Sequence, residues 1–189
     1  MPPPPLSSPS ASALPGWFPG GNCPDAQVVF NATNFYRARH QAPPLAWSEA
    51  LARDATAYAQ VLAAKSCLLK HASYGENLMQ VIGYPKPTVS CLGAIHGWYS
   101  QALLYNFAAK YPYTANWPKK IGHFSQLVWS DSSLFGCGVA VADVAIAGQG
   151  RTYPGGCRMV VCRYLSFGNV ALDYMFLKNV RANTSAIVL

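Results

Sequence analysis

The chain has 189 residues, of which 51% are hydrophobic and 11% are charged. This length suits one domain with a tail, and the composition excludes an intrinsically disordered protein. Fourteen Lys and Arg against seven Asp and Glu give a formal net charge of +7. That charge favours anionic partners such as lipid headgroups or a cell-wall polysaccharide, although a mildly basic solvated surface explains it equally well. The basic residues are scattered without a nucleic-acid motif, so we expect no nucleic-acid partner.

Both ends of the chain differ from its middle. Residues 1–24 are rich in Pro, Ser and Gly and lack the apolar side chains that order a segment, so we expect a linker or tail there. No continuous apolar run follows Met1, so we expect that this sequence lacks a signal peptide and that its N-terminus is truncated. We expect a folded domain over residues 25–182 and a C-terminal tail over residues 183–189, which is too short to span a membrane.

Three segments of the first half have the apolar spacing of helices. The first runs over residues 27–42 and ends before two consecutive prolines. The second runs over residues 47–64, where Ser48 can act as a cap and the small Ala side chains allow close packing against a sheet. The third runs over residues 92–107, and residues 83–87 before it form a loop.

The chain beyond Ser133 is β-prone. Gly136–Ala142 and Cys157–Tyr164 are short β-prone runs, and the glycine-rich segment Ala147–Gly156 separates them. This pattern predicts an antiparallel hairpin. Helices followed by strands indicate an α+β layered domain.

The six cysteines show none of the tight pairing of a zinc site. They are Cys23, Cys67, Cys91, Cys137, Cys157 and Cys162. An even count in a small domain predicts disulfides and an oxidising, extracellular compartment, with reduced thiols in the cytosol as the alternative. If Cys157 and Cys162 share one strand, about 16 Å separates them, so they do not bridge each other. Sequons at Asn31 and Asn183 are candidate glycosylation sites that agree with secretion.

Two stretches carry candidate site residues. Gly122–Ser132 begins with His123 after a glycine, and apolar residues follow that can anchor the segment in a core. In Lys70–Leu78, His71 and Glu76 lie five positions apart across a glycine, a spacing that suits a turn with both side chains in one cavity. A hydrogen-bonded structural role for the histidines is the alternative to a functional one.

Together these two stretches resemble the CAP superfamily, which comprises cysteine-rich secretory proteins, antigen 5 and pathogenesis-related proteins, and the pattern is closest to the plant type. Further motifs agree with the resemblance across roughly residues 25 to 180: Asn34 with Arg37, Trp47–Leu51, Val161–Tyr164 and Gly168 with Asn169. It implies a three-layer α-β-α sandwich with a small antiparallel sheet. It also implies a short helical turn rather than a strand at residues 123–129, and a disulfide between Cys67 and Cys137.

The resemblance further implies a cleft with two histidines and two glutamates. Motif matching places His71, Glu76 and His123 there directly, and the fourth position falls on Gln101 instead of a glutamate. Glutamine supplies a dipole where the family offers a charge. We therefore expect that no cofactor is required, and that His71 and His123 bind a divalent metal such as zinc only weakly.

The resemblance implies a secreted module that binds a sterol or fatty acid in a defence or matrix role, without catalytic activity. An aromatic loop at residues 105–117 could line a lipid groove or simply pack in the core. One alternative is a metal-assisted hydrolase in which a His–Glu pair activates water, or Ser73 or Ser125 acts as nucleophile. The second alternative is a structural cell-wall component, which the proline-rich tail suggests.

Overall fold

The computed structural model describes residues 18–184, so the remaining parts of the two expected tails, residues 1–17 and 185–189, lie outside the described chain. The helices are α1 (Ala26–Arg39), α2 (Glu49–Ala63), α3 (Leu92–Ser100), α4 (Pro112–Asn116), α5 (Gly122–Leu127) and α6 (Asp173–Asn179), with short 3-10 turns η1 (Gln101–Leu104) and η2 (Trp117–Lys119). The strands are β1 (Ala46–Trp47), β2 (Glu76–Gly83), β3 (Leu134–Gly148) and β4 (Arg151–Leu165), in the order β1-β3-β4-β2.

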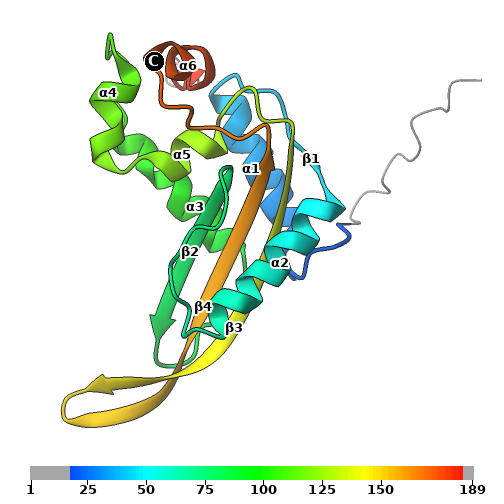
Figure 1. Cartoon of the computed structure of the whole chain (residues 1–189), viewed down its shortest axis with the longest axis vertical. Coiled ribbons are helices and arrows are strands. Elements are labelled where there is room, and N and C mark those ends of the chain that lie inside the picture. The colour runs from blue at the N-terminus through cyan, green and yellow to red at the C-terminus, as the bar shows by residue number, and fades with distance from the viewer. Residues whose placement is uncertain (1–17, 185–189) are drawn as a thin grey trace, which may run out of the picture.

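The four strands separate two hydrophobic cores (Figure 1). Helix α2 covers one face, where Ala55, Ala59 and Leu62 pack with strand residues. Helices α1, α3 and α5 cover the other face and contribute to the larger core. Successive strand residues point to opposite faces, so Val160 joins the larger core and Val161 the smaller one. The expected α+β sandwich is confirmed, and the expected turn at residues 123–129 is helical.

The sheet is mixed, whereas the resemblance implied an antiparallel one. Strand β1 pairs parallel with β3 through Ala46 and Trp47, and the other pairs are antiparallel. The expected antiparallel hairpin is present as β3 and β4. Both strands run continuously into the glycine-rich segment between the two β-prone runs, and only Gln149 and Gly150 form the turn. Both turn residues have positive φ, 51° and 71°, as the two-residue turns that match the twist of a hairpin require.

The close packing of α2 on the sheet depends on small residues on both sides. Ser48 caps the helix by accepting a hydrogen bond from Leu51 N at 3.3 Å. Gly136 of β3 lies against Ala52, where a side chain would collide with the backbone of the helix. This contact explains the alanine-rich helix face that the sequence shows.

The expected disulfide between Cys67 and Cys137 is wrong. The bridges are Cys23–Cys91, Cys67–Cys157 and Cys137–Cys162. Cys137 lies directly opposite Cys162 in the β3–β4 register, with 4.1 Å between their Cα atoms. Cys157 and Cys162 are an odd number of positions apart on β4, so their side chains point to opposite faces, and Cys157 meets Cys67 on the α2 side.

The last residues of the expected N-terminal linker pack against the domain. Phe18 contacts Phe30 and Trp47, with ring centroids 5.2 Å apart in both pairs. Asn22 Oδ1 accepts a hydrogen bond from Val139 N at 2.8 Å. Within residues 18–184 no helix has the length and apolar character needed to cross a membrane.

Candidate functional site

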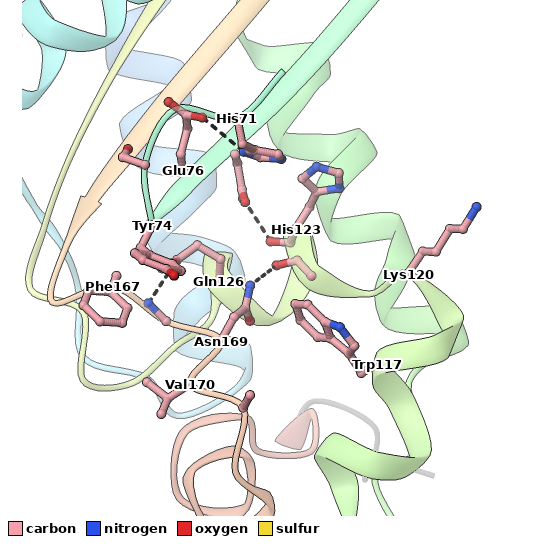
Figure 2. A pocket seen from close by; sticks show the side chains of 16 residues that line it. His71, Tyr74, Glu76, Trp117, Lys120, His123, Gln126, Phe167, Asn169 and Val170 are labelled. Atoms are coloured by element: carbon pink, nitrogen blue, oxygen red, sulfur yellow. Dashed lines mark hydrogen bonds and ion pairs between the residues drawn. The ribbon is translucent and has the colours of Figure 1, made fainter. Parts of the chain in front are cut away.

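A cavity of about 730 Å³ lies between the loop before β2, helix α5 and the segment after β4. Figure 2 shows the imidazoles of His71 and His123 near each other at one end, Tyr74 and Phe167 on one side in this view, and Trp117 on the other. The lining residues are His71, Ser73, Tyr74, Gly75, Glu76, Asn77, Trp117, Lys120, Gly122, His123, Gln126, Phe167, Gly168, Asn169, Val170 and Ala171.

Glu76 is the first residue of β2, and Gly75 sets its position. Gly75 has a φ of +66°, and a Cβ there would lie 2.8 Å from Tyr164 O, so only glycine fits this turn without strain. The Glu76 side chain is buried, and its Oε1 accepts hydrogen bonds from His71 Nδ1 and Ala72 N, both at 3.1 Å. His71 is more open, with 55% of its side chain exposed.

The charge of Glu76 is neutralised from the neighbouring strand. Arg163 is its direct partner in the β2–β4 register. Arg163 Nη2 lies 3.1 Å from Glu76 Oε2, so the two side chains form an ion pair, although their geometry is not that of a hydrogen bond. Arg163 also forms an ion pair with Asp54. The sequence did not indicate this role of Arg163, although the residue lies in Val161–Tyr164, one of the motifs that resemble the CAP superfamily. Strand register is the information that was missing.

His123 is held from two sides. Asn77 Nδ2 donates to His123 O at 3.0 Å, and Gln101 Nε2 lies 2.9 Å from His123 Nδ1. Burial and the nearby His71 lower the pKa of His123 to about 4, so its imidazole is neutral at ordinary pH. The structure thus brings His71, Glu76 and His123 into one cavity lining, with Gln101 in contact with His123 from behind.

The aromatic loop divides between two roles. Tyr105 is buried and packs against Phe124, with ring centroids 5.7 Å apart. Trp117 lines the cavity, and Phe107 lines a second, smaller hollow beside His40. The loop therefore contributes both to the core and to the cavity wall.

The candidate metal residues do not gather into a zinc site. Zinc in proteins normally takes three or four protein ligands around one point. Within residues 18–184, the ligand atoms of His71, Glu76 and His123 do not all lie within 4.8 Å of one another. Glu76 is moreover occupied by Arg163 and by Ala72 N. This arrangement does not fit a resident metal ion.

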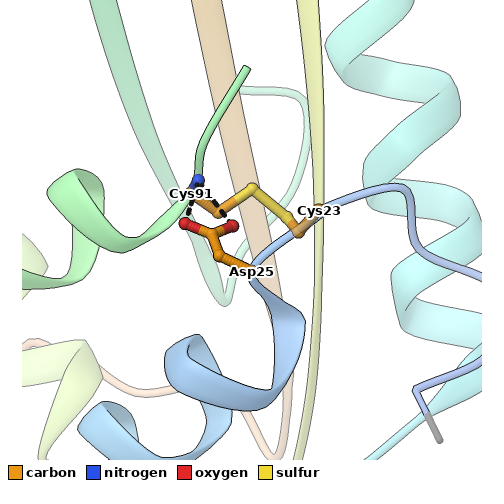
Figure 3. Close-up of side chains that lie close together, drawn as sticks. All are labelled: Cys23, Asp25 and Cys91. Atoms are coloured by element: carbon orange, nitrogen blue, oxygen red, sulfur yellow. Dashed lines mark hydrogen bonds between the residues drawn. A yellow bond between two sulfur atoms is a disulfide. The ribbon is translucent and has the colours of Figure 1, made fainter. Parts of the chain in front are cut away.

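One cluster of metal-ligand residue types does occur in the described chain, and it is a structural cap (Figure 3). The sulfurs of Cys23 and Cys91 are joined in a disulfide. The carboxylate of Asp25 accepts hydrogen bonds from Ser90 Oγ, Cys91 N and Leu92 N at 2.7 to 3.0 Å, and so caps α3. Burial raises the pKa of Asp25, but these hydrogen bonds outweigh it and the pKa lies below its usual value.

A model of the cysteine-rich secretory protein family, CAP, matches residues 30–164. The chain belongs to the CAP family. Golgi-associated plant pathogenesis-related protein 1 of Homo sapiens is 30% identical over 158 residues, which cover 80% of this CAP protein and 89% of that one. Secreted protein RBT4 of Candida albicans is 34% identical over 156 residues, which cover 77% and 36% respectively. The resemblance seen in the sequence is confirmed.

The structural comparison agrees with the fold. The crystal structure of NaASP2 with Zn²⁺ has a TM-score of 0.52 and 18% sequence identity, over 86% of this chain and 90% of that chain. This CAP protein spans 61% and 47% of the length of two other Candida albicans relatives. It therefore matches one part of each of these longer proteins.

Proposed function

We propose that this CAP protein is a secreted binding module that takes a sterol or a fatty acid in its cavity and does not turn it over. The observation that carries the proposal is that the amide side chains around the cavity are bonded to the protein itself, which leaves mainly apolar surface for a ligand. The bonds are Asn77 Nδ2 to His123 O, Gly168 N to Gln126 Oε1 and Asn169 Nδ2 to Gly122 O, at 3.0, 2.7 and 2.8 Å.

The size and the walls of the cavity support the same ligand class. Its volume of about 730 Å³ falls in the range of roughly 300–1,000 Å³ typical of small-molecule sites, which are mainly apolar with few polar groups. Tyr74 and Phe167 pack together with ring centroids 5.5 Å apart. Both residues are exposed, Tyr74 to 86% and Phe167 to 51%. Exposed aromatic rings at the wall of a cavity suit a large apolar ligand.

The disulfides support secretion. All six cysteines are bridged, and disulfides persist in oxidising compartments. The relative named a secreted protein agrees with this location. Relatives named pathogenesis-related proteins support a defence role there.

The hydrolase alternative has less support. Ser125 is fully buried, and its Oγ donates to Asn169 Oδ1 at 2.5 Å. Ser73 lines the cavity, but among the described residues it makes no hydrogen bond to either histidine. Neither serine is therefore arranged as an activated nucleophile, which needs a base within hydrogen-bond reach. The wall-component alternative rests on the tail, most of which lies outside the described residues.

We expect the purified protein to retain labelled cholesterol or palmitate and to release each of them chemically unchanged. The protein would be incubated with each lipid, separated from free lipid, and extracted for chromatography. Parallel assays with protease and esterase substrates, with and without zinc, test turnover. Zinc-dependent turnover that is lost in His123→Ala, together with no retained lipid, would replace this function with the hydrolase.

A further inference from the structure

The side chain of Gln101 lies between a backbone amide and the imidazole of His123. Its Oε1 accepts a hydrogen bond from Phe124 N at 3.2 Å, and its Nε2 lies 2.9 Å from His123 Nδ1. A backbone N–H can only donate. The amide oxygen must therefore face Phe124, because the opposite orientation would place two donors against each other, and the amide nitrogen must face His123.

This orientation decides where the proton of His123 lies. An amide nitrogen only donates, so His123 Nδ1 must accept. A neutral imidazole with an accepting Nδ1 carries its proton on Nε2. Nε2–H is then the group that His123 offers to a ligand.

We propose that Gln101 is a positioning residue that holds His123 as the Nε2–H tautomer, so that the cavity binds the acceptor oxygen of an amphiphile and not a metal cation. Metal ligation needs the lone pair of a ring nitrogen, and a ligating histidine normally donates its other N–H to a carboxylate, carbonyl or water. With Gln101 as the donor, His123 Nδ1 is instead an acceptor, and the proton on Nε2 leaves no lone pair there for a metal.

The surroundings of His123 favour the same ligand chemistry. The carboxylate of Glu76 already accepts hydrogen bonds from Ala72 N and His71 and forms an ion pair with Arg163. It therefore offers little net attraction to a cation. Beyond the histidines the walls include Tyr74, Phe167 and Trp117. An apolar chain or ring system with a terminal hydroxyl or carboxylate fits this combination. The ligand half of the inference rests on the proposed lipid-binding function, whereas the tautomer does not.

The tautomer can be read directly by long-range ¹H–¹⁵N correlation spectra of the imidazole rings in ¹⁵N-labelled wild-type protein. We expect a protonated Nε2 and an unprotonated Nδ1 for His123. A proton on Nδ1 in the wild type would overturn the inference without reference to any variant. This result is independent of lipid binding, so failure of the tautomer and failure of the proposed function are distinguishable.

Gln101→Glu should move the proton to Nδ1, because a carboxylate accepts where the amide donates. Zinc affinity measured by calorimetry should then rise about 10- to 100-fold, the effect typical of changing the partner of a ligating histidine. Gln60→Glu adds the same charge on the exposed face of α2 and should change neither quantity. Equal zinc affinity in wild type and Gln101→Glu would contradict the assignment.

The ligand class is tested in the wild-type spectra with dodecanoic acid, dodecanol and dodecane added separately. We expect the Nε2 resonance of His123 to shift with the acid, the alcohol or both, and the pattern distinguishes a carboxylate from a hydroxyl. An equal shift with dodecane, or no shift with any of the three, would overturn the acceptor-oxygen half of the inference.

Discussion

Replacing Cys67 and Cys157 together by alanine should lower the free energy of unfolding by about 4.6 kcal/mol, on the chain-entropy estimate for a closed loop of this length. The two cysteines are 90 positions apart, and both are fully buried. Their bridge joins the segment after α2 to β4 on the face of the sheet that has the smaller core. Loss of the bridge increases the conformational entropy of the unfolded chain and also removes a covalent link in this layer of the folded protein.

Urea unfolding of the wild type and the double variant measures this change. The matched control is Cys137→Ala with Cys162→Ala, which opens a loop of only 25 positions and should cost about 3.5 kcal/mol. A smaller loss for the first pair than for the second would contradict the loop argument. Peptide mapping without reduction checks the pairing itself, and a peptide linking Cys67 to Cys137 would contradict the β3–β4 register.

Arg37→Met should lower the free energy of unfolding by about 4 kcal/mol, within the range expected when a buried hydrogen-bonded network is broken. Arg37 is fully buried in α1, and burial lowers its pKa to about 10. Its guanidinium donates to the carbonyls of Pro43, Leu127, Trp129 and Ser132 at 2.8 to 3.1 Å. Methionine fills much of the space but removes all four of these hydrogen bonds, and within the described chain only Trp129 O keeps another donor, Ser132 N at 3.1 Å.

The effect of Arg37→Met should reach the cavity, because Leu127 ends the helix that begins beside His123. Chemical denaturation gives the stability change, and the ring resonances of His123 report the cavity. Arg53→Met removes an arginine whose side chain is 70% exposed and should cost less than about 1 kcal/mol. A similarly small cost for Arg37→Met would mean that the three contacts with Leu127, Trp129 and Ser132 do not hold α1 to the end of α5 and the segment after it.

The sequence predicted three helices because their apolar spacing follows from local burial. The third was expected to reach residue 107, but its α-helix ends at Ser100 and only a 3-10 turn continues to Leu104. It also predicted a turn at the glycine between His71 and Glu76, and Gly75 has the positive φ of such a turn, which is a local requirement. The structure adds that Glu76 starts a strand, which the sequence did not indicate. Only the β2–β4 register brings Arg163 opposite it, and that register depends on residues distant in the chain.

The disulfide error has the same origin. The glycine-rich segment 147–156 has the composition of a loop, yet its residues pair through to the two-residue turn at Gln149 and Gly150. That turn fixes the register of fifteen-residue strands and so selects Cys162 as the partner of Cys137. The helix α6 was missed because its short sequence is ordered mainly by contacts such as those of Phe176 with Trp129.

The most direct test of lipid binding in the cavity is to fill the cavity and measure the affinity for a fluorescent sterol and a fluorescent polyene fatty acid. Ala171 lines the cavity and is exposed, so Ala171→Trp occupies ligand space without disturbing the core. Ala50→Trp places the same bulk on the exposed side of α2, away from the cavity lining. We expect Ala171→Trp to weaken binding of at least one probe about tenfold or more, equivalent to about 1.4 kcal/mol, while Ala50→Trp binds like the wild type. Unchanged binding of both probes by a folded Ala171→Trp variant, or no binding by the wild type, would contradict lipid binding in the cavity.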